Sequence, residues 1–339
     1  MLSRAFTVKP RWSPSRRDGD GISCKLGSIL EYSEDCLVVG FEDDLPLVFC
    51  GNNNESQLTL REVLRASVSV MGESRLGMTQ KAVLLEGKIY AVKRFRKVRV
   101  GRREFGKRVE RLSQVSQKCA YLVPVTAFLY SKRIKFVLCD YYPMGSLADL
   151  LSGGRELGHT ALDWKQRLTI AIDIARAIAF IHTRHPPYEK NMQMNVHGNV
   201  KASNVMIKNN LTACLSDYGF AHLVESDEVS DTWQQKPPPQ KQQESPYCNK
   251  CCQKSDIYNF GIILLDMLGG STASGVVHCI LDNKEEIRKG AIEYFEFVVE
   301  GKERQKAMKV LDIALACANK SPEDRPSIEH VSKVLEMLL

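Results

Sequence analysis

The chain has 339 residues, of which 44% are apolar and 26% are charged, with no long biased tract. This composition excludes a mostly disordered, collagen-like or fibrous protein, and the length suits one large domain or two lobes. The formal net charge of +7 is mild, because 40 acidic residues oppose 47 basic ones, so charge alone does not indicate a nucleic-acid partner. The eleven cysteines are scattered and no apolar signal stretch follows Met1, which favours a reducing cytoplasm.

Residues 1–57 are expected to form a basic tail and a variable lead-in, partly disordered. Residues 1–17 contain five basic side chains and no acid, which is typical of a solvated tail. Two alternatives are contact with acidic lipid at the inner face of the plasma membrane and an organelle transit peptide. No membrane span is expected, because the longest apolar stretch, residues 260–268, contains an acid and is far shorter than the ~20 residues that a spanning helix needs.

The pattern becomes regular from Leu58. Residues 58–66 predict a short amphipathic helix, and residues 82–93 predict two strands around a turn at Glu86-Gly87. A charged helix is expected over residues 102–117. A strand-rich stretch, residues 122–142, follows it.

Beyond residue 142 the periodicity is mainly helical. The helices are expected at residues 164–185, 254–268, 306–318 and 327–338. A small β-rich part followed by a larger α-rich part predicts a two-lobed α+β fold. We expect the β-rich N-lobe at residues 58–140 and the α-helical C-lobe at residues 141–339.

The first half of the chain contains residues suited to binding phosphate. Gly72-Glu-Ser-Arg-Leu-Gly77 precedes a strand and predicts a turn close to phosphate groups. Lys93 ends an apolar strand, where an unpaired ammonium is costly unless a carboxylate or phosphate meets it. Glu110 on the following helix is the expected partner, and Glu104 is another register.

Two later motifs complete a set in chain order. His197-Gly-Asn-Val-Lys-Ala-Ser-Asn204 is followed thirteen residues later by Asp217-Tyr-Gly219. Together with the turn, the strand lysine and the helix acid, they match the template for phosphoryl transfer, in which an asparagine and an aspartate hold the metal.

With these motifs the chain resembles the protein kinases, and more narrowly the intracellular domain of plant leucine-rich-repeat receptor-like kinases. The resemblance runs from about Leu58 to the end of the chain. It includes four further segments: Tyr141-Tyr-Pro-Met-Gly-Ser-Leu147, Leu162-Asp-Trp164, Lys254-Ser-Asp-Ile-Tyr-Asn-Phe-Gly261 and Ser321-Pro-Glu-Asp-Arg-Pro326. The resemblance implies the two-lobed kinase fold with a nucleotide cleft between the lobes.

The chain departs from the family at several positions. Asn199 stands where active kinases carry the aspartate that accepts the substrate hydroxyl proton, and an amide is not a base near neutral pH. Gly198 replaces the arginine of that motif, and Ser74 replaces the middle glycine of the phosphate turn. Pro237-Pro-Pro239 replaces the segment whose glutamate would pair with Arg325, so Arg325 is expected to find another partner.

The retained residues imply an intact nucleotide site. By the resemblance, Gly72, Gly77, Lys93 and Glu110 would bind ATP, Asn204 and Asp217 would bind the nucleotide through Mg²⁺, and Lys201 would lie near the transferring phosphate. We therefore expect a pseudokinase that binds ATP, with Mg²⁺, and signals through contacts with other protein kinases or receptor complexes. A slow but active Ser/Thr protein kinase is the alternative. A fold kept for its surface, with an empty cleft, is a third reading.

Other residues invite simpler interpretations. His197 is expected to brace the catalytic loop (residues 197–204) from the core, and the resemblance implies that Asp256 accepts hydrogen bonds from the backbone of that loop. The Cys248-Asn-Lys-Cys-Cys252 run favours loop thiols over a metal site, because it lacks a second Cys or His pair. Ser226, Ser230 and Thr232 are either phosphorylation sites or polar loop residues.

Overall fold

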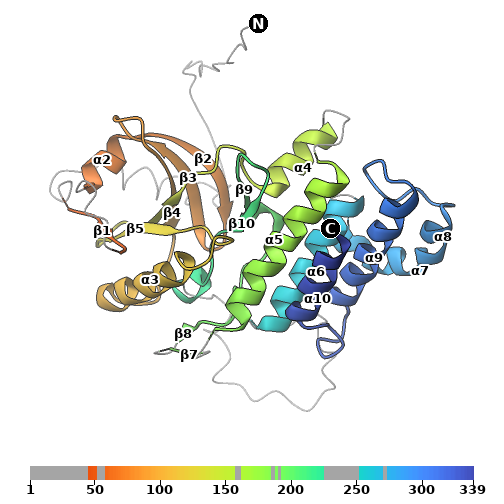
Figure 1. Ribbon diagram of the computed structural model, residues 1–339. Coiled ribbons are helices and arrows are strands. Elements are labelled where there is room, and N and C mark those ends of the chain that lie inside the picture. The colour runs from red at the N-terminus through yellow and green to blue at the C-terminus, as the bar shows by residue number, and fades with distance from the viewer. Residues whose placement is uncertain are drawn as a thin grey trace, which may run out of the picture. The chain divides into compact units, whose positions relative to one another are not determined.

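The structure is a computed structural model that describes residues 45–51, 58–156, 162–184, 188–189, 192–224, 252–269 and 273–339 (Figure 1). The predictions for the basic tail, for Pro237–Pro239, for the hydroxyl residues at 226–232 and for Cys248 and Cys251 lie outside these residues. Within the described ranges, no helix is both long enough and apolar enough to cross a membrane.

The first part of the fold is one antiparallel sheet of six strands in the order β1-β5-β6-β4-β3-β2. The strands are β1 (Val48–Phe49), β2 (Ser67–Ser74), β3 (Gly77–Val83), β4 (Ile89–Phe95), β5 (Val125–Tyr130) and β6 (Lys135–Asp140). The predicted turn at Glu86-Gly87 joins β3 to β4, with Gly87 at φ +82°. Strand β1 comes from the lead-in, so the sheet extends beyond the boundary predicted at residue 58, pairing Val48 with Phe128.

Two helices accompany the sheet. Helix α2 (Leu60–Arg65) begins at a capping box in which Thr59 and Glu62 satisfy each other's backbone N–H groups. Helix α3 (Arg102–Ser116) packs an apolar stripe against the sheet, with Phe105 lying edge-on to Phe128 of β5. Because α3 is charged on its outer face and apolar on this one, its amphipathic pattern fixes which side chains turn inward.

The second part is mainly helical, as predicted. It contains α4 (Leu147–Glu156), α5 (Trp164–His182), α6 (Gln253–Gly269), α7 (Ala273–Asp282), α8 (Lys284–Lys289), α9 (Gly301–Cys317) and α10 (Ile328–Leu338). It also contains the short strands β7 (Tyr188–Glu189), β8 (Met192–Gln193), β9 (Val205–Ile207) and β10 (Ala213–Leu215), and the 3₁₀ turns η1 (Ala202–Asn204) and η2 (Phe220–His222). The predicted arrangement of a small β-rich lobe and a larger α-helical lobe is thereby confirmed.

Helix α6 is buried at the centre of this part and contacts α9 closely. A Cβ on Gly261 would lie 2.8 Å from the carbonyl oxygen of Ala314, so only glycine permits this approach. Helix α4 was not predicted, because Gly153 and Gly154 each disfavour a helix by about 1 kcal/mol. Packing of Leu147 and Leu151 in the core outweighs that cost.

Arg325 finds the alternative partners that the sequence analysis required. Its guanidinium is buried, with 3% exposure, and donates to the carbonyl oxygens of Asn319 and Lys254, at 2.8 Å each. It also donates to the carbonyl of Lys320 at 3.4 Å and lies over the Tyr258 ring at 4.9 Å. The arginine therefore joins the start of α6 to the loop before α10.

Replacing Arg325 by leucine should lower the free energy of unfolding by about 2–4 kcal/mol, because buried carbonyl groups lose a charged donor. The matched control is Arg176→Leu, since the Arg176 side chain is 42% exposed and pairs with Glu336, so its loss should cost less than about 1 kcal/mol. Urea unfolding of both variants measures the difference. Equal losses would contradict a special role for Arg325.

Candidate functional site

A cleft with about 880 Å³ of empty space, open to solvent, lies between the sheet and the helical part. The sheet contributes residues from β2, β3, β4 and β6, and the helical part contributes the loop around η1 and the segment after β10. Five of the predicted site residues line this cleft: Gly72, Lys93, Lys201, Asn204 and Asp217. The cleft thus brings together residues from both lobes, as the predicted site requires.

Lys93 and Asp217 form an ion pair across the cleft. The Lys93 ammonium lies 2.9 Å from Asp217 Oδ2, and the two side chains are only 7% and 9% exposed. Lys93 is held on the interior of β4 by pairing with Thr79 of β3 and Val137 of β6. Asp217 has φ +65°, a left-handed conformation that turns its carboxylate toward the lysine.

The prediction that Lys93 pairs with Glu110 is wrong, because Lys93 pairs with Asp217 instead. Glu110 is exposed on α3, on a side of the helix where its charge acts on Cys50. The apolar stripe of α3 fixes this orientation, because Val109 is fully buried and its neighbour is consequently turned away.

The α3 side chain that reaches toward the Asp217 segment is Arg108. It donates to the carbonyl oxygen of His222 at 2.7 Å and pairs with Glu104 at 2.8 Å. One turn later, Leu112 packs closely on Gly219. A Cβ atom added to Gly219 would lie 2.4 Å from Leu112 Cδ2. Helical periodicity from Leu112 was the signal that could have identified Arg108, and the two acids of the helix, Glu104 and Glu110, obscured it.

The phosphate turn is formed by the end of β2 and the start of β3. Ser74 donates its hydroxyl to the Gly77 carbonyl at 3.3 Å, so the side chain that replaces a glycine is used within the turn. Gly77 has φ +144°, and a Cβ there would lie 1.9 Å from the Arg94 carbonyl oxygen. The need for glycine at residue 77 is therefore explained by its close approach to β4.

The catalytic loop is held by hydrogen bonds within itself and to the segment that leads to Asp217. Asn204 is buried and donates its amide N–H to the Asn199 carbonyl at 2.8 Å. Ser216, which immediately precedes Asp217, donates its backbone N–H to the Asn204 carbonyl at 2.8 Å. These contacts place the two predicted metal ligands, Asn204 and Asp217, beside each other in the cleft.

Asn199 contacts the ion pair directly. Its amide nitrogen donates to Asp217 Oδ2 at 3.3 Å, the same oxygen that the Lys93 ammonium contacts. Lys201 is half-buried in the cleft, and burial lowers the pKa of its ammonium, with Lys93 and Arg75 adding repulsion and Asp217 opposing the shift. An amide beside two lysines can orient a ligand, but it cannot take up a proton.

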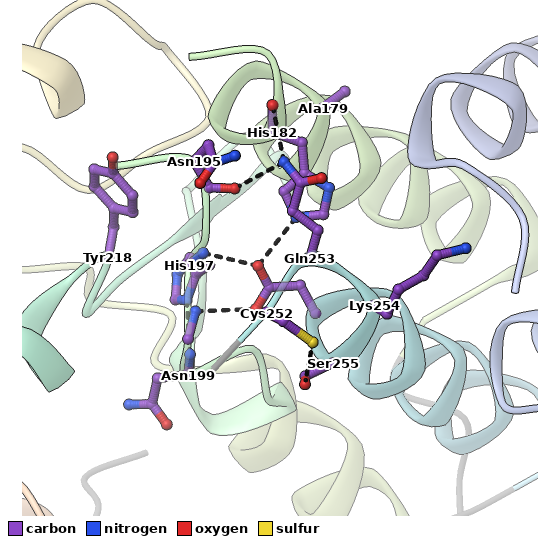
Figure 2. A network of polar contacts seen from close by, with 12 residues as sticks. Ala179, His182, Asn195, His197, Asn199, Tyr218, Cys252, Gln253, Lys254 and Ser255 are labelled. Carbon is purple, nitrogen blue, oxygen red and sulfur yellow. Dashed lines mark hydrogen bonds and ion pairs between the residues drawn. The ribbon is translucent and has the colours of Figure 1, made fainter. Parts of the chain in front are cut away.

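Asp256 anchors the catalytic loop from α6, as predicted. Its carboxylate accepts the backbone N–H groups of His197 at 2.7 Å and Gly198 at 2.9 Å, and contacts the His182 ring nitrogen at 3.0 Å. Gln253 extends this network by donating to the carbonyls of His182 and Asn195, both at 3.0 Å (Figure 2).

His197 occupies the core as expected. Burial lowers the pKa of its imidazole, so the ring is neutral at physiological pH, and its Nδ1 accepts the Asn199 backbone N–H at 3.2 Å. Tyr218, buried beside it, donates its hydroxyl to the Met194 carbonyl at 2.5 Å. The extra hydroxyl of this tyrosine thus has a partner.

Cys139 lines the cleft at the end of β6 and was not predicted as a site residue. It is buried, and burial raises the pKa of its thiol, so the side chain is neutral and acts as a small apolar group. Its position within a buried apolar strand hid its role as a lining residue. Among the described residues, no group of acids, histidines and cysteines is arranged to hold a metal ion by itself.

Comparison with known proteins identifies the fold's family. The family described as protein tyrosine and serine/threonine kinase matches residues 67–335. The chain belongs to the protein kinase family. A "Probable inactive receptor kinase" of Arabidopsis thaliana is 32% identical to this kinase domain, over 97% of the chain and 50% of the relative.

Two solved structures are similar to this kinase domain. The pseudokinase domain of BIR2, described as an immune regulator of the RLK/Pelle family, has a TM-score of 0.71 at 23% identity, covering 89% of this chain and 92% of that one. The kinase domain of maize SIRK1 bound to AMP-PNP has a TM-score of 0.65 at 26% identity, covering 84% and 98%. The chain spans about half the length of the first curated relatives that it matches.

Replacing Asp256 by asparagine should destabilise the kinase domain by about 2–4 kcal/mol, because the amide NH₂ would face a backbone N–H where the carboxylate oxygen accepts one. The matched control is Asp163→Asn, because Asp163 is an exposed N-cap of α5 and asparagine caps a helix equally well. Urea unfolding should show little change in the control. A similar small change for Asp256→Asn would contradict the anchoring role.

Proposed function

We propose that this kinase domain binds ATP in its cleft and is impaired in phosphoryl transfer. The observation that supports this best is the contact of Asn199 with Asp217, at the position where the family carries its base. Loss of a general base costs about 10²–10⁴ in rate, whereas it removes no group that grips the nucleotide phosphates. Binding and transfer are therefore separable in this cleft.

The chemistry of the lining residues supports a nucleotide ligand. Ala91, Val123 and Met206 offer an apolar surface for the adenine ring of a nucleotide. Lys93 and Lys201 offer positive charge for its phosphates. Asn204 and Asp217 are the residues that would hold Mg²⁺ when it accompanies the nucleotide, since amide and carboxylate oxygens are ligands that this ion accepts. Mg²⁺ would supply charge neutralisation for the phosphates.

The relatives favour the same conclusion. The curated relative is named inactive, and maize SIRK1, a kinase domain of the same fold, was seen with a non-hydrolysable ATP analogue. We further propose that the domain acts in the cytoplasm near the plasma membrane, through contacts with other protein kinases or receptor complexes. The names of the relatives, which describe them as inactive receptor kinases, are the support for this setting.

The alternative is a slow Ser/Thr kinase. Lys201 retains its place in the cleft, and positioning with electrostatic stabilisation supplies most of the rate in phosphoryl transfer. Asn199 could orient a substrate hydroxyl through its amide. This reading predicts weak transfer that depends on Asp217.

Transfer of labelled γ-phosphate by the purified chain, to itself and to a generic acceptor, distinguishes the two functions. We expect no transfer above that of an Asp217→Asn control, because the base is absent. Transfer that vanishes in the control would establish the slow kinase instead.

Nucleotide binding needs its own measurement. Millimolar ATP should raise the melting temperature of the wild type, because a ligand that binds only the folded state stabilises it. Lys93→Met should abolish the shift, whereas Lys135→Met, outside the cleft, should preserve it. Absence of a shift in the wild type would favour the empty-cleft reading.

A further inference from the structure

Asp217 is held in a backbone conformation that side chains rarely adopt. Its φ of +65° is left-handed, and among the described residues Leu211 is the only other non-glycine with a positive φ. Such a residue persists only where the surrounding contacts hold it. The Asp217 carboxylate is held by Lys93 and Asn199, which both contact Oδ2. The backbone on either side of Asp217 needs anchors of its own.

Hydrogen bonds to the catalytic loop anchor the chain before and after Asp217. Ser216 donates its backbone N–H, at 2.8 Å, and its hydroxyl, at 3.1 Å, to the Asn204 carbonyl. On the other side, Gly219 donates its backbone N–H to the His197 carbonyl at a longer 3.3 Å. The backbone contacts are therefore closer before Asp217 than after it.

Tyr218 anchors the second side through its hydroxyl group. The hydroxyl donates to the Met194 carbonyl at 2.5 Å, and the two residues are only 5% and 4% exposed. Burial raises the pKa of this hydroxyl, so the group keeps its proton and donates it. Because both residues are buried, breaking the bond leaves the Met194 carbonyl without a donor and without ready access to water.

Tyr218 is not among the residues that line the cleft, so its hydroxyl acts on the site through its neighbour Asp217. We propose that the Tyr218 hydroxyl is a positioning group that keeps the Asp217 carboxylate turned into the cleft. While the hydroxyl is bound to Met194, the residue after Asp217 is fixed, and the left-handed turn is fixed with it. When the bond breaks, the segment rotates away more readily, and Lys93 then loses its carboxylate partner.

The consequence for the cleft rests on the proposed function, in which Asp217 would hold Mg²⁺ when it accompanies a nucleotide. The hydrogen bond itself can be tested without nucleotide, because Lys93 reports whether Asp217 is in place. An amine is acetylated only in its uncharged form, and the buried pair with Asp217 favours the charged form. Lys93 therefore reacts when the pair is open.

The test is Tyr218→Phe, which keeps the ring and removes only the hydroxyl. The purified chain is trace-labelled with acetic anhydride and read by mass spectrometry, with exposed Lys88 in the turn before β4 as the internal reference. The rate at Lys93 relative to Lys88 should rise about fivefold in the variant, the factor that corresponds to one lost neutral hydrogen bond.

The matched control is Tyr294→Phe. Tyr294 is a half-buried tyrosine outside the cleft lining, and its hydroxyl donates to the Leu265 carbonyl at 3.4 Å. Its loss should leave the relative rate at Lys93 within about twofold of the wild type. An unchanged rate in Tyr218→Phe would overturn the positioning role. An equal rise in both variants would also overturn it, because the effect would then be a general loss of stability.

A second arm repeats the labelling with millimolar ATP and Mg²⁺. Bound nucleotide should slow acetylation of Lys93 in the wild type and in Tyr218→Phe, because phosphates cover the ammonium. No protection in the wild type would count against the proposed function. A fivefold rise in the nucleotide-free variant would still support the positioning role in that case, so the two failures are distinguishable.

Discussion

The structure depends on the buried ion pair between Lys93 and Asp217, which joins residues 124 positions apart in the chain. Each partner is supplied by a different lobe, one by β4 and the other by the segment after β10. Removing one member of a buried pair costs about 3–5 kcal/mol, because the other is left charged and unpaired. The pair therefore links the two sides of the cleft. Because the charges of Lys93 and Asp217 compensate each other, the pair itself contributes no net charge to the cleft.

Asn199 and Arg108 explain why the pair takes this form. In α3 the side chain that reaches toward Asp217's segment is an arginine bound to the His222 carbonyl, so the helix does not bring a carboxylate to Lys93. Asn199 presents an amide hydrogen to the same Asp217 oxygen that accepts from the lysine. An aspartate at residue 199 would instead place two carboxylates side by side, which is costly without a cation between them.

The sequence predicted the fold because its signals were local and periodic. The strands around Gly87 and the helix of residues 102–117 follow from patterns that neighbouring residues share, whereas the anchoring by Asp256 was implied by the resemblance to the kinase family. The choice of Glu110 failed because the two acids of the helix allow two registers, and only packing of Phe105, Val109 and Leu112 selects between them. Cys139 was missed for a related reason, since a buried strand residue becomes a lining residue only when the second lobe is in place.

Substrate binding and catalysis place opposite demands on charge in this cleft. Phosphate binding improves as acids are removed, because each lost carboxylate leaves a lysine or arginine less fully compensated. Transfer worsens, because it needs a base for the hydroxyl and a metal ion that would neutralise charge on the moving phosphoryl group. A neutral amide at residue 199 and an outward-facing Glu110 both favour the proposed nucleotide binding over phosphoryl transfer. In the proposed function, the amide at residue 199 therefore impairs phosphoryl transfer, while Lys93 and Lys201 remain in the cleft lining.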